Sequence, residues 1–361
     1  MFILVVLLSV IVPIYCKPPE FLQECIDSIL TQTFGDFELI LINDASPDNS
    51  TGLLRKDTLR DRRIKLIHFC KNRGVATARN VGLCIAQGKY VVFIDADDII
   101  DISYFETLIT IAEQFSLDIV TTSTNNFCTT EQLKLIYPFY LNAKINNIPL
   151  RTLSVQHFIC RLFRRSAIES LTFDEHLHTG EDILFIHRAM LAATRCIEIR
   201  YRGYCYRHAP KDLMQNYYKK FAHQKCVSLS LQQRISEMLY LVDQLSELKI
   251  FSKTNRDTRF IDYFSLRRLL RYSNFIWDLK EKKDQETYWQ RFCILFYTKF
   301  SQQIIPCFSI YIGWIFSHTK PFFGIRFFIY WARIFWELYN IRQNFYRFTR
   351  IIKLVWKGYV C

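Results

Sequence analysis

The chain has 361 residues, of which 50% are hydrophobic and 22% are charged, and its formal net charge is +13. This composition excludes an intrinsically disordered chain, and the length predicts about two globular domains. The basic residues are concentrated near the C-terminus, where residues 291–361 contain ten lysines and arginines but one acid, Glu337. Most of the excess positive charge therefore belongs to this C-terminal segment.

The cysteines and the N-terminus indicate a reducing compartment. The twelve cysteines include no CxxC pair and no regular spacing, so we expect free thiols rather than a disulfide framework. The apolar segment 1–12 has no basic leader and no small-residue cleavage site, and Pro13 follows it directly. It is also shorter than the ~20 apolar residues that span a bilayer. We interpret it as the first strand of a cytoplasmic protein.

Strands alternate with helices along the first half of the chain. Apolar, β-branched runs predict buried strands, and apolar residues at helical spacing predict the helices between them. We expect strands at 7–12 (ended by Pro13), 37–42, 64–69, 90–94 and 118–123, and helices at 20–32 and 75–87. This alternation predicts an α/β fold with a mostly parallel sheet and right-handed crossovers.

Three carboxylates directly follow the predicted strand 90–94. Ligands of an open parallel sheet bind outside the carboxyl ends of its strands, so Asp95, Asp97 and Asp98 are expected to face a cleft. Asp95 and Asp97 can reach the same cation, and Mg²⁺ or Mn²⁺ shared with a diphosphate takes one or two protein carboxylates. The residues alone leave a polar turn at the strand end equally open.

The loops after the other strands add polar and aromatic groups to the same edge. Asp44 can accept from a base imide, Tyr15 can stack on the base, and Arg73 or Arg79 can offset phosphate charge. Arg79 equally suits a solvated position on a helix. Neither GxGxxG after the first strand nor GxxxxGK[ST] is present, which disfavours a dinucleotide site and a P-loop. Together with Pro13, this set predicts a nucleotide-diphosphate site.

Five segments resemble a known family when they are taken in order. They read SVIVPIY at 9–15, SILTQTF at 28–34, NDASPD at 43–48, NRGVATARNVG at 72–82 and FIDADD at 93–98. The series resembles family 2 inverting glycosyltransferases with the GT-A fold, of the type that builds bacterial surface polysaccharides. The resemblance continues at 161–165, 173–174 and 180–185 and covers roughly the first 210 residues.

The resemblance implies a role for each strand-end acid. Asp44 is similar to the uracil-binding aspartate of the family. Asp95-Ala96-Asp97 is similar to the DxD motif, with Asp95 nearer the ribose and Asp97 the expected ligand of Mn²⁺ or Mg²⁺, assisted by Asp98. Two positions differ from the family pattern, since Cys16 replaces an Asn and Asn43 replaces the first acid of a pair. UDP is therefore the first choice of nucleotide, and other bases stay open.

The resemblance also implies that Asp182 is the catalytic base. The flanking acid Glu181 favours proton uptake there, which suits a general base. The same two acids also suit the first turn of a helix, where negative charge is favoured by the dipole. His208 is a further candidate, expected to close over the site and touch the metal or diphosphate; an ordinary polar loop residue is the alternative.

The implied reaction moves a sugar from a nucleotide diphosphate sugar to a hydroxyl of a glycan or lipid-linked glycan, with inversion. Two other functions stay open. A sequence pI of about 9.1 and aromatic residues among arginines suggest a nucleic-acid-binding protein. A sugar nucleotidyltransferase would use a related fold. The acidic strand ends would repel phosphate, so no nucleic-acid partner is expected.

The second half of the chain reads as helical. We expect a GT-A domain at 1–215 and a helical region at 216–361, with helices at 222–248 and 260–279 and a charged linker or helix face at 280–286. The basic, aromatic segment 291–361 predicts an interfacial helix on anionic lipid, at ~1 kcal/mol per cation. A helical subdomain with a basic exposed face is the alternative. The expected location is cytoplasmic, peripheral on the inner face of the cell membrane.

Overall fold

A computed structural model describes residues 6–48, 50–127, 158–199, 201–208 and 230–248, together with isolated positions between Tyr217 and Leu295. The chain divides into two compact units, Met1–Tyr263 and Phe264–Cys361. The elements described below belong to the first unit. The predicted domain division at residue 215 stays a prediction.

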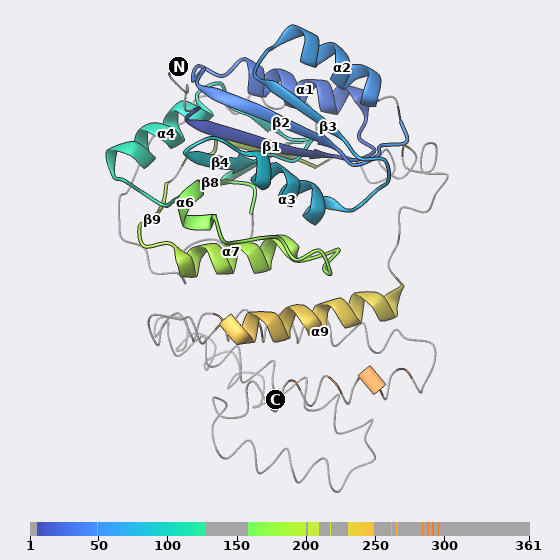
Figure 1. The fold of residues 1–361 in the computed structure, drawn as a ribbon. Helices are drawn as coiled ribbons and strands as arrows, with labels where there is room; N and C mark the ends of the chain where they lie inside the picture. The colour runs from blue at the N-terminus through green and yellow to red at the C-terminus, as the bar shows by residue number, and fades with distance from the viewer. Residues whose placement is uncertain are drawn as a thin grey trace, which may run out of the picture. The chain divides into compact units, whose positions relative to one another are not determined.

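The first unit is built around a mixed sheet to which seven of the described strands belong (Figure 1). Its order across the sheet is β3 (Ile64–His68), β2 (Phe37–Asn43), β1 (Leu8–Ile14), β4 (Tyr90–Phe93), β8 (Arg161–Arg164), β6 (Ile119–Thr121) and β9 (Cys196–Glu198). Strand β8 runs antiparallel to both of its neighbours, whereas the remaining pairs are parallel. The predicted α/β class with a mostly parallel sheet is confirmed.

Helices cover both faces of this sheet. The helices are α1 (Pro19–Leu30), α2 (Ser50–Arg60), α3 (Val75–Ile85), α4 (Tyr104–Gln114), α6 (Arg165–Ile168) and α7 (Glu181–Ala192), and a further helix, α9 (Leu231–Glu247), packs against α7. Figure 1 shows α1 and α2 on one side of the sheet and α3 and α7 on the other. This follows from the strand order: the chain moves outward from β1 to β3 and then returns to β4, so right-handed crossovers place α3 on the opposite face.

The five predicted strands and the two predicted helices are present, with ends that shift by a few residues. One difference has a clear physical cause. Strand β1 continues past Pro13, which was expected to end it, because the carbonyl of Ile14 still accepts a hydrogen bond from the amide of Asp44 at 2.8 Å. Proline removes a donor from the strand but leaves its carbonyl available.

A small second sheet, which the sequence analysis did not predict, is formed by three strands that follow β4 in the chain. It has the order β5 (Ile99–Ile100), β10 (Tyr204–Arg207), β7 (Thr124–Phe127). Strand β10 is antiparallel to β5 and parallel to β7. It brings the segment 201–208 to the acidic turn after β4, more than 100 residues earlier in the chain.

An aromatic cluster fills the core beside α7. Phe93 of β4 contacts Phe158, Phe163, Phe173 and Phe185, with ring centroids 4.9 to 6.1 Å apart. Phe173 and Phe185 are stacked at 4.1 Å. Close packing of these rings holds β4, β8 and α7 rigidly against one another.

The predicted helix at 222–248 is confirmed over α9. It begins after Ser230, whose hydroxyl accepts from the amide of Gln233, while the Gln233 side chain accepts from the Ser230 amide. This capping box explains the start of the helix.

The expectations for 260–279, 280–286 and the basic tail fall outside the described residues except at isolated positions. No helix in the described part of the chain is long and apolar enough to cross a bilayer.

Candidate active site

The loops that follow β1, β2 and β4 contact one another at one edge of the sheet, as parallel strand order requires. The amide of Asp44, after β2, donates to the carbonyl of Ile14 at the end of β1. Lys17, a little further along the same loop as Tyr15, donates from Nζ to Oδ2 of Asp97 at 2.6 Å. The residues predicted to bind the donor therefore share this edge.

Asp44 organises the loop that begins α3. Its carboxylate accepts from the amides of Arg73 at 2.6 Å and Gly74 at 2.8 Å, and from the side chain of Asn72 at 3.0 Å. Gly74 has φ +89°, a left-handed conformation that favours glycine. Burial raises the pKa of the Asp44 carboxyl, and the amide donors oppose that rise. Arg73 itself is exposed, with its guanidinium 5.2 Å from the ring centre of Phe69.

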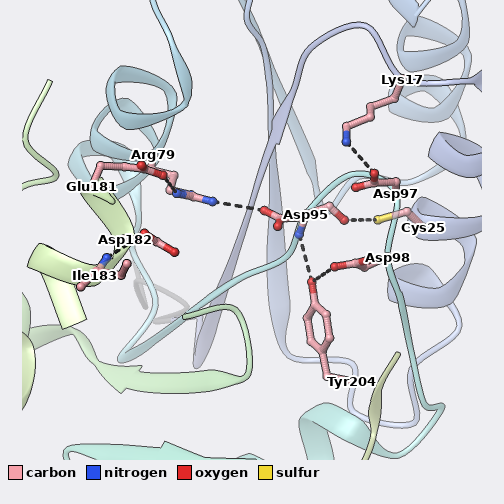
Figure 2. Close-up of polar contacts among 10 residues, drawn as sticks. All are labelled: Lys17, Cys25, Arg79, Asp95, Asp97, Asp98, Glu181, Asp182, Ile183 and Tyr204. Atoms are coloured by element: carbon pink, nitrogen blue, oxygen red, sulfur yellow. Dashed lines mark hydrogen bonds and ion pairs between the residues drawn. The ribbon is translucent and has the colours of Figure 1, made fainter. Parts of the chain in front are cut away.

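Asp95 and Asp97 have different partners (Figure 2). Asp97 pairs with Lys17, whereas Oδ1 of Asp95 accepts from Nη2 of Arg79 at 3.2 Å. Both pairs are ionic, so each acid is already balanced by a basic side chain. The Lys17 ammonium contacts Oδ2 of Asp97.

Asp98 is anchored on both oxygens. It is 1% exposed, and it accepts from the hydroxyl of Tyr204 and from the amide of Arg207, each at 2.8 Å. Burial raises its pKa well above the ordinary value, and the charges of Asp95 and Asp97 add to that effect. These contacts favour a role in fixing the turn after β4 rather than the predicted assistance to the metal.

Arg79 joins the strand-end acids to α7. It is 5% exposed, and its Nη1 donates to Oε1 of Glu181 at 2.8 Å while Nη2 reaches Asp95 (Figure 2). Its guanidinium lies 5.0 Å from the ring centre of Phe158 and 5.4 Å from that of Phe173. Burial lowers the pKa of Arg79, but the nearby carboxylates outweigh it and leave the pKa raised.

The buried position of Arg79 corrects the sequence analysis. The solvated helix position is wrong, because the side chain lies inside the protein. Both Nη groups bind carboxylates, so the contacts favour a bridge between acids over the predicted phosphate contact. A buried arginine held by two carboxylates and two aromatic rings is well fixed in position.

Glu181 and Asp182 form the first turn of α7. Gly180 precedes them with φ +93°, and Oδ1 of Asp182 accepts from the amide of Ile183 at 2.8 Å. In Figure 2 the Asp182 carboxylate extends toward the side on which Asp95 lies. Burial raises the pKa of Glu181 to about 7, and the Arg79 ion pair limits that rise. The two acids thus do open a helix, and the half-buried Asp182 also remains a candidate base.

Three residues near the acids were missed by the sequence analysis. They are Lys17, Tyr204 and Arg207, the last of which is buried and donates from Nε to the carbonyl of Asp97 at 2.7 Å. Its neighbour His208 is exposed, with its ring 5.0 Å from that of Tyr206. The predicted metal contact of His208 stays a prediction. The Tyr204–His208 segment drew attention only for that histidine, because nothing in its local pattern shows a partner at Asp98.

The strand-end residues fit a divalent cation shared with a diphosphate. No cluster of three or more histidine, cysteine or acidic side chains that could enclose a metal occurs within the described ranges. A metal bound mainly by phosphate oxygens needs one or two protein carboxylates. Asp97, whose carboxylate pairs with Lys17 and is partly exposed, is the residue of this set that would hold such a cation.

Known proteins with similar sequences are glycosyltransferases. The sequence model for glycosyl transferase family 2 matches residues 9–172. The glycosyltransferase EpsJ of Bacillus subtilis is 36% identical over 225 residues, which cover 59% of this chain and 64% of EpsJ. The chain thus spans less than two thirds of that relative. An uncharacterized glycosyltransferase of Haemophilus influenzae is 34% identical over 181 residues, covering 50% of this chain and 70% of that protein.

Solved structures show the same fold. The Staphylococcus aureus TarS fragment 1–349 in complex with UDP-GlcNAc aligns with a TM-score of 0.58 and 20% identity over 81% of each chain. The mannosyltransferase PcManGT of Pyrobaculum calidifontis, in complex with GDP-Man and Mn²⁺, aligns with a TM-score of 0.50 and 16% sequence identity. This alignment covers 87% of this chain and 81% of PcManGT. The predicted GT-A fold is thereby confirmed. From its sequence matches and its fold, the chain belongs to glycosyl transferase family 2.

Proposed function

We propose that this protein transfers a sugar from a nucleotide diphosphate sugar to a hydroxyl group of a glycan or lipid-linked glycan, with inversion at the anomeric carbon. The observation that carries the proposal is the Arg79 bridge, which joins Asp95 of the strand-end acids to Glu181, the neighbour of Asp182. A donor-binding acid and a candidate base thus lie on the two sides of one side chain.

The donor would lie along the edge formed by the ends of β1, β2 and β4. In the proposal Tyr15 and Pro13 flank the base, Asp44 contacts it, and Asp95 lies near the ribose. The exposed Arg73 is available to the diphosphate. The UDP-GlcNAc and GDP-Man complexes of TarS and PcManGT support a nucleotide-sugar donor, and UDP is our first choice.

Asp97 is the proposed ligand of Mn²⁺ or Mg²⁺. When bound, the cation would neutralise the negative charge of the leaving diphosphate. The PcManGT complex with Mn²⁺ supports this choice of ion. Lys17, which pairs with Asp97 at 2.6 Å, would exchange its carboxylate partner for a phosphate oxygen as the donor binds.

Asp182 is the proposed general base. Its carboxylate takes the proton of the acceptor hydroxyl, and the acceptor oxygen attacks the anomeric carbon as the bond to the diphosphate breaks. Because attack occurs on the face opposite the leaving group, the configuration inverts. The chain needs no covalent intermediate for this single displacement.

The test is a turnover assay on the full chain with a panel of UDP-sugars and GDP-sugars, Mn²⁺ or Mg²⁺, and glycan acceptors. We expect the wild type to release nucleoside diphosphate and Asp97→Ala and Asp182→Asn to lose this activity. Asp36→Asn is the control, since Asp36 is exposed and precedes β2 at the opposite edge of the sheet. Equal turnover in all four proteins would refute the proposal, and release of pyrophosphate would indicate a nucleotidyltransferase instead.

A further inference from the structure

Helix α9 contacts the loop that leads into α7. The amide and Nδ1 of His178 contact the two carboxylate oxygens of Glu237, at 3.2 and 2.7 Å. The hydroxyl of Tyr240, one turn further along α9, donates to Oδ2 of Asp174 at 2.9 Å. Two neighbouring side chains of α9 therefore hold both ends of the segment 174–178.

The opposite side of the same loop is held by α3. Asn80 accepts from the amide of Phe173 at 2.7 Å and donates to its carbonyl at 3.0 Å. It also contacts the carboxylate of Glu175 at 3.0 Å, and Leu177 of the loop is buried. The loop 173–180 thus lies between α3 and α9, elements that are separated by about 150 residues of chain.

The loop ends at the residues proposed for catalysis. Three residues separate His178 from Asp182, and one of them, Gly180, has a left-handed conformation. A shift of the loop would therefore be transmitted to the first turn of α7. Helix α9 also contacts α7 directly, since Arg188 donates to Gln244 at 3.3 Å.

Three of the four donor-side acids depend on other elements, whereas Asp95 is linked to Glu181 of α7 through Arg79. Asp44 binds the loop 72–74, Asp97 binds Lys17, and Asp98 binds the β10 residues Tyr204 and Arg207. A change in α9 is therefore expected to affect Asp182 and to leave the contacts of Asp44, Asp97 and Asp98 intact.

We propose that Glu237 and Tyr240 of α9 are positioning residues for the general base. They fix the loop 173–180, so that Asp182 meets the acceptor hydroxyl in a reactive geometry. This inference rests on the proposed role of Asp182. Displacements of about 1 Å at a catalytic group reduce rates by up to about 100-fold, so even these outer contacts have a measurable consequence.

The test compares the double variant Glu237→Ala/Tyr240→Phe with wild type in the full chain. Tyr240 is 37% exposed, and the contacts to be removed lie near the surface, so the variant is expected to fold with a nearly unchanged melting temperature. We expect a kcat for sugar transfer about 10-fold below wild type and a donor Kd within twofold of it. Arg234→Gln, an exposed position on the same helix, is the matched control, and Glu237→Gln should recover part of the rate because it keeps an acceptor oxygen.

A second readout does not require turnover. Hydrogen exchange of the amides at 173–184 should be faster in the double variant, whereas exchange at 72–74 should be unchanged. Exchange at 173–184 equal to that of wild type, or a wild-type kcat, would overturn the inference. Absence of turnover in the wild type itself, with donor and acceptor panels exhausted, would instead refute the proposed function.

Discussion

The proposed site has a donor side, with Asp44, Asp95, Asp97 and Asp98, and a base side, with Glu181 and Asp182. Different contacts hold these two sides in place. On the donor side, Asp44 accepts hydrogen bonds from the backbone amides of Arg73 and Gly74, and Asp98 accepts one from the amide of Arg207. On the base side, Glu181 is balanced by the single side chain of Arg79, and the preceding loop is held by side chains of α3 and α9. Backbone contacts persist when side chains change, so mutations should affect the base side more strongly than the donor side.

The largest effect is expected where the two sides meet. Arg79→Met would leave the buried Glu181 without its basic partner and would remove the partner of Asp95. Losing one member of a buried ion pair costs roughly 3–5 kcal/mol of unfolding free energy. Urea denaturation of the variant should show this loss. Arg60→Met is the control, because Arg60 is 73% exposed and its ion pair with Asp57 contributes about 0–1 kcal/mol. Equal losses of unfolding free energy in the two variants would contradict the bridging role of Arg79.

A second prediction concerns pH and probes the base side alone. The pKa of Glu181 is about 7 in the folded protein and 4.5 in its ordinary state, so the folded form binds the proton more tightly between these values. The contribution of Glu181 to stability therefore decreases as pH rises from about 4.5 to about 7, by roughly 3 kcal/mol. Glu181→Gln should remove this part of the pH dependence in urea unfolding at pH 5 and pH 7.5. An unchanged difference between the two pH values would show that Glu181 does not titrate there.

The third prediction tests the donor side. The hydroxyl of Tyr204, which is fully buried, donates to Asp98 and accepts from the amide of Asp95 at 3.1 Å. Tyr204→Phe removes both bonds and leaves buried polar groups unsatisfied, at a cost of about 1–3 kcal/mol. The loss should be smaller than that of Arg79→Met because Asp98 keeps its bond from the Arg207 amide. A loss in Tyr204→Phe that exceeds the Arg79→Met value would reverse the comparison.

The smallest effect is expected at Lys17. Its ion pair with Asp97 is partly exposed, and such pairs contribute about 0–1 kcal/mol. If the ammonium competes with a divalent cation for that carboxylate, Lys17→Met should lower the Kd for Mn²⁺ without donor by up to about fivefold. Electron paramagnetic resonance of free Mn²⁺ measures this directly. Lys89→Met, which breaks a surface pair with Glu113, should leave the Kd unchanged, and weaker Mn²⁺ binding by Lys17→Met would mean that the lysine assists the cation.

Local patterns predicted the strands and the sheet edge that carries the donor-side acids, but not the side chains that contact these acids. Apolar, β-branched runs predict the strands, and their parallel order predicts that Asp44 and Asp97 lie at one edge of the sheet. The base-side contacts could not be read in this way, because they join residues such as Arg79 and Glu181 that lie 102 positions apart. The contact between Asp98 and Tyr204 could not be predicted either, because Tyr204 lies in a four-residue strand that is too short to show a clear alternation of apolar and polar residues.

The most direct test of the account separates donor binding from transfer in Asp182→Asn. Titration with the preferred nucleotide sugar and Mn²⁺ should give a wild-type Kd, because the donor-side acids do not contact Asp182. Transfer to the acceptor should be slower by about 100-fold or more, as expected for loss of a general base. A variant that transfers at the wild-type rate, or that no longer binds the donor, would contradict the division of the site into a donor side and a base side.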